Sequence, residues 1–183
     1  SRVPIAMGTN KGGAFLQVQP DSSVAQTRRP DELVVCDDGS TDETLSILKG
    51  FSERAPFPVR ADRNETNIGY VRNFEQALSR CVGDIIFLSD QDDIWFNDKI
   101  ERVLGVFENW PDAMVVLNDQ VIADEHLVPS DVTKLANIRR LGLPDFRFIT
   151  GCCSAHRKDW LSVVLPIPQI GCSHDRWINE IAH

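Results

Sequence analysis

Three acidic residues that follow an apolar run are the first candidates for chemistry. The run covers residues 85–88, and Asp90, Asp92 and Asp93 come after it. Its β-branched and aromatic side chains predict a short buried strand, and acids at the end of such a strand lie where open α/β sheets bind ligands. Carboxylates this close repel one another unless a cation neutralises them, and Mg2+ or Mn2+ prefers such oxygen ligands. The alternative is a solvated acidic turn that caps a helix beginning near Asp98.

A second acidic pair, Asp37 and Asp38, follows another apolar run at residues 33–36. Ser40 and Glu43 match the capping-box pattern S-x-x-E, which predicts that a helix begins there. The two aspartates would then lie in a strand-to-helix turn, where acids of nucleotide-binding folds bind a base or a ribose. The alternative is that they serve only the turn and the helix dipole.

Two further segments could approach an anionic ligand. Residues 3–7 predict a strand, and the glycine pair at residues 12–13 would let the following loop approach a ligand closely. The next helix would cover residues 15–26, and Pro20 inside it predicts a kink or a break. Arg72 lies in the first turn of a later helix, which opposes the helix dipole unless an anionic diphosphate lies nearby. An exposed arginine is the alternative.

The remaining elements must position these groups. They are helices at about residues 71–78, 100–107, 158–165 and from 174 onward, and strands near residue 59 and at 114–117 and 147–150. Ser173 is the expected N-cap of the last helix. Residues 121–145 are less patterned, and we interpret them as a surface insertion that is partly helical. Because strands alternate with helices, we expect an α/β, Rossmann-like single domain with a mostly parallel central sheet flanked by helices.

Composition excludes several classes of protein. The 183 residues are enough for one good core. A net charge of −8 argues against binding to nucleic acid, which needs a basic face, and gives no bulk attraction to an anionic membrane. No apolar stretch approaches the roughly 20 residues of a membrane span, and no secretory leader is visible. The chain begins at Ser1 without Met, so we expect that an upstream portion has been removed.

The cysteines indicate the cellular compartment and raise the question of a zinc site. Their number, five, is odd, and none forms a CxxC motif. This favours a reduced cytoplasmic compartment over a disulfide framework. A cluster of possible zinc ligands matches no standard finger or ribbon spacing, so a structural zinc site is the weaker interpretation; its members are Cys152, Cys153, His156, Cys172 and His174.

Four motifs in order give the chain a resemblance to a known family. Residues 33–42, LVVCDDGSTD, look like the VVDDGSTD element of the inverting nucleotide-sugar glycosyltransferases of family 2, which have the GT-A fold. Residues 67–73 resemble the N-x-G-x-x-x-N element of that family. Residues 90–95 resemble its DxD element, in the DQDD form common among bacterial polysaccharide transferases. His174-Asp175 with Trp177 is similar to the HD or ED element.

The resemblance implies roles for individual residues. Asp92 would bind the divalent metal, Mg2+ or Mn2+, together with Asp90 and Asp93. Asp175 would be the catalytic base that deprotonates the acceptor hydroxyl. The acceptor side would include Gly151, His174 and Trp177. The donor-binding residues would be Thr9, Asp37, Asp38, Asn67, Gly69, Arg72, Asn73 and Asp90.

The resemblance also implies substrates and an organisation of the chain. The enzyme would move a sugar from a nucleotide-diphosphate donor to a saccharide or lipid-linked saccharide, in cell-surface polysaccharide synthesis. Residues 1–117 would form the nucleotide-sugar-binding half and residues 118–183 the acceptor-side half. The chain ends eight residues after Asp175, where family members continue, so we expect a C-terminally trimmed domain. The expected location is the cytoplasm, with at most peripheral association at the inner face of the membrane.

One departure from the family pattern keeps other functions open. Residues 9–12 read T-N-K-G where the family usually has T-Y-N-G, so the usual aromatic residue is missing. A non-catalytic nucleotide-sugar-binding domain would fit this loop and the short C-terminus. A nucleotidyltransferase that makes the activated sugar is a further alternative, although such an enzyme would need a glycine-rich basic loop near its N-terminus.

Overall fold

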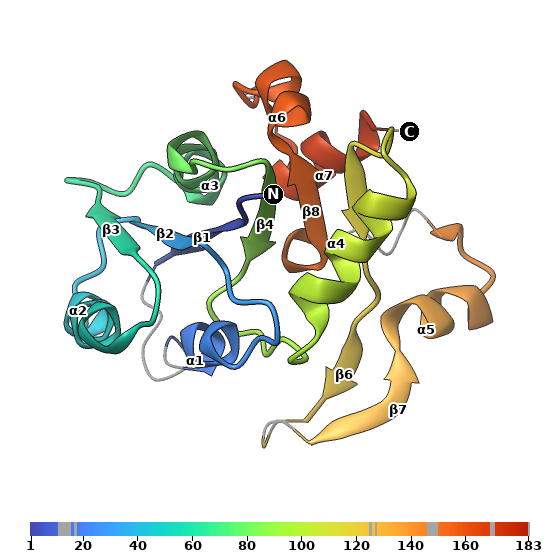
Figure 1. The fold of residues 1–183 in the computed structure, drawn as a ribbon, viewed down its shortest axis with the longest axis horizontal. Helices are drawn as coiled ribbons and strands as arrows, with labels where there is room; N and C mark the ends of the chain where they lie inside the picture. Colours follow the sequence, from blue (N-terminus) through green and yellow to red (C-terminus); the bar gives the residue numbers. More distant parts are fainter. Residues whose placement is uncertain are drawn as a thin grey trace.

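The computed structural model describes residues 1–10, 16, 18–124, 126, 128–145, 150–168 and 171–182. In chain order, the elements are β1 (Pro4–Thr9), α1 (Val18–Val24), β2 (Glu32–Asp37), α2 (Thr44–Arg54), β3 (Val59–Arg63), α3 (Tyr70–Arg80), β4 (Ile85–Ser89), α4 (Lys99–Asn109), β5 (Val115–Leu117), β6 (Val121–Ala123), β7 (Pro129–Thr133), α5 (Lys134–Arg140), the 3₁₀ helix η3 (Gly151–Cys153), β8 (Ser154–Arg157), α6 (Lys158–Val164) and α7 (His174–Glu180). Figure 1 shows their arrangement.

The central sheet is six-stranded and has the order β3-β2-β1-β4-β8-β5. The first four of these strands are parallel to one another, whereas β8 runs antiparallel to both of its neighbours. The predicted α/β fold with a mostly parallel sheet is therefore confirmed. Because β8 lies between β4 and β5, residues on both sides of position 117 share one sheet. The functional division at that position stays a prediction.

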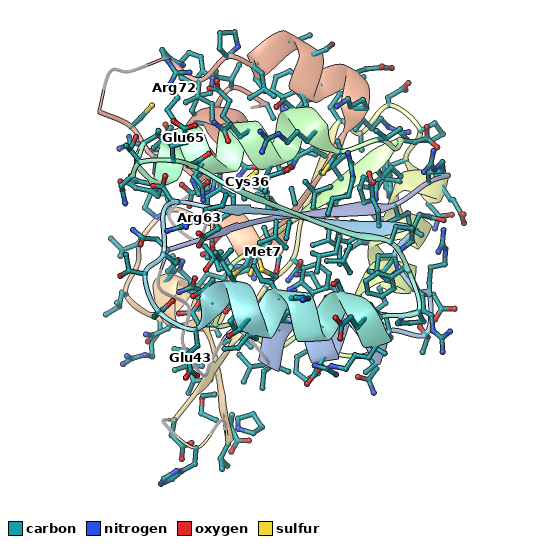
Figure 2. The ribbon with its side chains drawn as sticks, turned by 90° about the vertical axis from the view of Figure 1, so that its left-hand side faces the viewer. Met7, Cys36, Glu43, Arg63, Glu65 and Arg72 are labelled. Atoms are coloured by element: carbon teal, nitrogen blue, oxygen red, sulfur yellow. The ribbon has the colours of Figure 1, made fainter. Side chains whose placement is uncertain are left out.

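Helices cover both faces of the sheet. Alternate residues of each buried strand point to opposite faces, so Met7 packs on the side of α2 and α4, and Cys36 packs on the side of α3, α6 and α7. Figure 2 views the sheet nearly edge-on, with Cys36 toward α3 and Met7 toward α2. This arrangement gives two apolar layers and holds the carboxyl ends of β1, β2 and β4 at one edge.

Two predictions about helix starts are wrong. Pro20 does not kink a helix, because α1 begins at Val18 and places the proline in the first turn, where a backbone N–H is not needed. Ser40 does not cap α2, which begins at Thr44. Its hydroxyl and its backbone N–H donate instead to the carboxylate of Asp37. Asp42 accepts from the backbone N–H of Thr44 at 3.0 Å.

The region after β5 is more ordered than its sequence pattern indicates. Residues 121–145 hold the two-stranded sheet β6-β7, which projects away from the central sheet in Figure 1, and the predicted helical part, α5. Most of the strand predicted at residues 147–150 lies outside the described residues, as do the glycine pair at 12–13 and the start of the helix predicted at 15–26. None of the described helices is both long and apolar enough to cross a membrane.

Candidate active site

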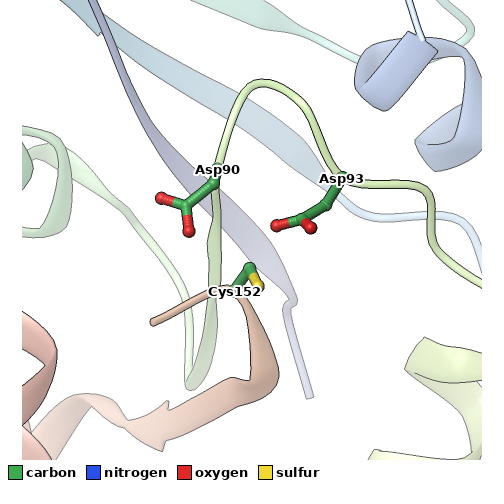
Figure 3. Close-up of side chains that lie close together, drawn as sticks. All are labelled: Asp90, Asp93 and Cys152. Atoms are coloured by element: carbon green, nitrogen blue, oxygen red, sulfur yellow. The ribbon is translucent and has the colours of Figure 1, made fainter. Parts of the chain in front are cut away.

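An acidic cluster lies at the carboxyl edge of the sheet, beyond β4. Ligand atoms of Asp90, Asp93 and Cys152 lie within 4.8 Å of one another, and Figure 3 shows the three side chains converging from two segments of the chain. The strand register explains why these three side chains lie close together. Ala155 of β8 pairs with Phe87 of β4 in antiparallel fashion, so the residues before β8 lie beside the residues that follow β4.

Electrostatics at this cluster favour a bound cation. Burial, and then the charges of Asp93, Asp92 and Asp175, raise the pKa of Asp90 to about 6. Burial also raises the pKa of Asp93, although the Cys152 thiol and the Lys99 ammonium oppose this change. Both shifts disfavour the charged carboxylates, and an additional cation close to them would favour the charged forms.

Lys99 is a cationic neighbour of the cluster. Its Nζ donates to the carbonyl oxygen of Cys152 at 2.5 Å and lies 4.0 Å from the centroid of the Trp95 ring. Burial lowers the pKa of this lysine, while Cys153, Cys152, Asp93 and Asp90 act in the opposite direction. Lys99 thus fixes the η3 turn against the residues that follow the acidic motif.

Gln91 anchors the turn that carries the acids. Its Oε1 accepts from the hydroxyl of Thr9 at 2.5 Å and from the backbone N–H of Asn10 at 3.4 Å. Thr9 is buried at the end of β1, so this contact ties the acidic turn to the neighbouring strand. Asp92 is exposed and lies outside the group of side chains that converge here, and its predicted role in metal binding stays a prediction.

Asp37 and Asp38 are both buried and both accept hydrogen bonds from the chain itself. Asp37 accepts from Ser40 and lies 3.8 Å from the Arg63 guanidinium. Asp38 accepts from the backbone N–H groups of Ile68 and Gly69 at 2.8 and 2.9 Å. Each aspartate therefore positions a loop at the carboxyl edge, and the predicted contact with a nucleotide base stays a prediction.

The residues of the N-x-G-x-x-x-N segment hold the start of α3. Asn67 Oδ1 accepts from the backbone N–H of Gly69, whose φ of 86° suits glycine. Asn73 is buried and donates to the carbonyl oxygens of Cys36 and Thr9 at 2.7 and 3.3 Å. These contacts fix α3 on the ends of β1 and β2.

Arg72 forms an ion pair rather than standing free beside the acidic cluster. Its guanidinium lies 2.7 Å from Oε1 of Glu75, and the other carboxylate oxygen of Glu75 accepts from the backbone N–H of Ile167. The side chain is 38% exposed. The predicted diphosphate contact stays a prediction and would require this surface pair to open.

Gly151, His174 and Asp175 come together beside the cluster. A Cβ atom at Gly151 would lie 3.0 Å from His174 Nε2 and 3.5 Å from Asp175 Cβ, so a glycine permits the close approach of α7. His174 is buried and stacks on Phe74, with ring centroids 4.0 Å apart. Asp175 is near enough to influence the pKa of Asp90. The predicted base and the predicted metal ligands therefore share one site.

Trp177 contacts helix α6 rather than the acidic cluster. Its indole N–H donates to the carbonyl oxygen of Val164 at 2.9 Å, and its ring packs against the apolar layer that contains Leu161 and Ile178. These contacts attach α7 to α6. The structure gives Trp177 a packing role, and its predicted acceptor contact stays a prediction.

The zinc alternative has no support among the described residues. His156 pairs with Asn179 instead, at 3.0 Å. Of the proposed zinc ligands only Cys152 belongs to a group able to hold a metal, and its partners there are the two aspartates.

Comparisons with known proteins place the chain in a family. The model of the family "Glycosyl transferase family 2" matches residues 10–165. EpsE of Bacillus subtilis is 29% identical over 124 residues, which are 68% of this chain and 45% of EpsE. The chain spans less than half of the length of the curated relatives it matches.

Two solved structures have the same fold. TarS of S. aureus, in complex with UDP, has a TM-score of 0.71 at 20% identity, over 89% of this chain and 48% of that chain. The mannosyltransferase PcManGT of Pyrobaculum calidifontis, in complex with GDP-Man and Mn2+, has a TM-score of 0.76 at 19% identity, over 100% of this chain and 53% of that chain. The fold is therefore of the GT-A type, and with the family match over most of its length, the chain belongs to glycosyl transferase family 2.

Proposed function

We propose that this chain is the catalytic domain of a metal-dependent, inverting glycosyltransferase that moves a sugar from a nucleoside-diphosphate donor to an acceptor hydroxyl. One observation carries the proposal: Asp90, Asp93 and Asp175 share one site at the carboxyl edge of the sheet. Family membership supports the reaction class. The UDP bound to TarS and the GDP-Man and Mn2+ bound to PcManGT support the donor class and the metal.

Asp175 is the base of the proposed reaction. A hydroxyl group is a poor nucleophile until its proton is removed, so a carboxylate must accept that proton as the oxygen attacks the anomeric carbon. The new bond forms from oxygen to the anomeric carbon, and the bond from that carbon to the donor diphosphate breaks. The proton ends on Asp175 and the electron pair on the leaving diphosphate. A single displacement of this kind inverts the configuration at carbon.

Asp90 and Asp93 would hold the metal of the proposed reaction. Their donor set fits a divalent cation, because both carboxylates are partly buried, and burial together with the charges of neighbouring aspartates raises their pKa values. A bound metal would neutralise the charge that develops on the leaving diphosphate. Lys99 lies beside the carboxylates, and its positive charge weakens the repulsion between them when no metal is bound.

The loops around the acidic cluster would form the binding site for the nucleotide-sugar donor. Asp38 and Asn73 hold the loop before α3 against the ends of β1 and β2, which leaves the backbone of that loop at the edge where the metal would bind a diphosphate. The same side of the sheet would bind the nucleotide. The acceptor would be a saccharide or lipid-linked saccharide used in cell-surface polysaccharide synthesis, and the enzyme would act in the cytoplasm, at or near the inner face of the membrane.

Calorimetric titration with UDP, TDP and GDP, each with and without Mn2+, tests this proposal. We expect one nucleotide to bind, with an affinity that depends on Mn2+. Asp93→Asn should abolish the metal dependence, because it removes a carboxylate from the cluster. Asp92→Asn is the matched control, since Asp92 belongs to the same turn but lies exposed outside the ligand group.

Two results would contradict the proposal. If no nucleotide binds to the folded chain, the donor site is wrongly assigned. If a nucleotide binds equally well with and without Mn2+, the donor site stands and the metal dependence is wrong. A larger effect of Asp92→Asn than of Asp93→Asn would make Asp92 the main metal ligand, as the sequence resemblance implies.

A further inference from the structure

The acidic cluster contains a sulfur atom that the reaction described above does not use. Cys152 Sγ is one of the three ligand atoms that lie within 4.8 Å of one another, and the thiol lowers the pKa values of Asp90 and Asp93, opposing the effect of burial. The cysteine is 5% exposed. Figure 3 shows its side chain close to the two carboxylates.

The neighbouring cysteine has different partners. Cys153 Sγ lies 3.8 Å from Cys152 Sγ and donates to Oε1 of Gln120 at 3.2 Å. It is not part of the ligand group. Two adjacent thiols, equally buried, thus differ in whether they face the carboxylates.

The backbone holds Cys152 in place. Its carbonyl oxygen accepts from Lys99 Nζ, and the turn is closed on either side by the Cys153 N–H to Thr150 carbonyl bond at 3.0 Å and by the Ser154 hydroxyl to Gly151 carbonyl bond at 2.7 Å. The register of β8 against β4 fixes the turn beside Asp90. The thiol is therefore a fixed feature of the site.

Sulfur changes which metals a site prefers. Mg2+ and Mn2+ are hard ions that prefer oxygen ligands, whereas Co2+, Zn2+ and Cd2+ bind thiolate strongly. We infer that Cys152 is a metal ligand beside Asp90 and Asp93, and that it makes the site select thiophilic divalent cations over Mg2+. The inference rests on the proposed function, because it concerns the metal site of the same reaction.

Metal binding through this thiol would release its proton to solvent, since the thiolate is the ligand form. Lys99 opposes the binding of any cation, because its ammonium already interacts with both carboxylates. A strong metal–sulfur bond would compensate for that opposition better than an additional oxygen contact would. If Lys99 is itself the cation of the site, no metal will bind there at all.

The test uses the full chain and Co2+ alone as the probe. Every variant carries Cys172→Ser, because Cys172 is the least buried cysteine and could bind metal adventitiously. A cobalt–thiolate bond gives a charge-transfer absorption band in the near ultraviolet. We expect this band in the parent and in Cys153→Ser, and its loss in both Cys152→Ser and Cys152→Ala. Circular dichroism and urea midpoints show whether each variant is folded.

Competition titrations measure selectivity directly. Cys152→Ser should weaken Cd2+ binding by about 10- to 100-fold and leave Mg2+ binding unchanged within about threefold, as expected when one soft ligand is lost. Cys153→Ser should change neither affinity. Retention of the cobalt band in Cys152→Ser, or an equal loss in Cys153→Ser, would overturn the inference.

The inference and the proposed function fail in different ways. If the parent shows no cobalt band but binds a nucleotide in a Mn2+-dependent manner, the thiol is not a ligand and the proposed function stands. If it shows neither, Lys99 is the better candidate for the cation of the site, and the metal dependence fails as well. If the band appears without nucleotide binding, Cys152 is a ligand of a metal site that does not serve a donor.

Discussion

At the scale of single residues, Asp175 can be tested separately from the metal ligands. Asp175→Asn keeps the shape of the side chain but cannot accept a proton at neutral pH. We expect sugar transfer to fall by about 10²- to 10⁴-fold, while Mn2+-dependent nucleotide binding stays within about twofold of the parent, because the asparagine leaves Asp90 and Asp93 in place. Transfer assays and calorimetry on the same preparation measure the two quantities.

Asp159 provides the matched control for this substitution. It is an exposed aspartate in the first turn of α6, just as Asp175 lies in the first turn of α7. Asp159→Asn should leave transfer and binding unchanged. If Asp175→Asn retained full transfer, the base would have to be another group, and Asp90, with its raised pKa, would be the first to examine.

The sequence predicts which segments form the site, but it does not predict which side chains of those segments point into it. Acids after apolar runs identify the edge of the sheet correctly, because strand ends and acidic turns have local signatures. Asp92 and Asp93 are equivalent in such a pattern, and only the conformation of the turn directs Asp93 inward. Cys152 and Lys99 carry no local signal for this site, since their approach depends on where β8 enters the sheet.

At the scale of elements, Gly69 tests whether the loop before α3 needs its unusual backbone. Its φ of 86° is strained for any residue with a Cβ, although nothing lies within 4 Å of where that atom would be. Gly69→Ala should therefore destabilise the fold by about 1–2 kcal/mol through backbone strain alone. Urea unfolding monitored by fluorescence measures this change.

Gly50 is the control for that experiment. It lies inside α2, with nothing within 4 Å of an added Cβ and with no positive φ. Gly50→Ala should stabilise the protein by up to about 1 kcal/mol, because alanine favours the helix. A destabilisation of similar size in both variants would mean that φ at Gly69 is not the cause.

The elements that sequence reasoning misplaces have competing local interactions. Ser40 and Glu43 satisfy the capping-box pattern, but Asp37 precedes Ser40 and takes its hydroxyl. The strand β8 has the sequence Ser-Ala-His-Arg, with neither apolar alternation nor an apolar run, and its pairing on both sides makes it a strand. The long periodic helices α3 and α4 are predicted well, because their apolar stripes are strong.

At the scale of the whole molecule, a buried histidine links folding to pH. His156 lies in β8 at the centre of the fold, and burial lowers its pKa to about 4. The unfolded chain takes up this proton near pH 6.5, so its contribution to stability is complete above that pH and is lost as the pH falls toward 4. The loss amounts to about 3 kcal/mol. The pH dependence of the urea midpoint measures it.

Other groups contribute to this pH dependence. His174, also lowered to about 4 by burial, acts in the same direction. Asp90 acts in the opposite direction, because its raised pKa makes the folded state bind a proton more readily. His156→Gln should therefore weaken the pH dependence without removing it. Equal curves for His156→Gln and the parent would contradict the assignment.

The position of β8 has a consequence for the order of folding. Strand β5 reaches the sheet only through β8, which follows it by more than thirty residues, and β8 pairs with β4 across a still longer stretch of chain. Loop closure over such a distance is slow, so we expect β8 to enter a sheet that is already partly formed. Cys152 arrives with it, and the acidic cluster is complete only at that moment. The metal site proposed above would therefore be incomplete in any folding intermediate that lacks β8.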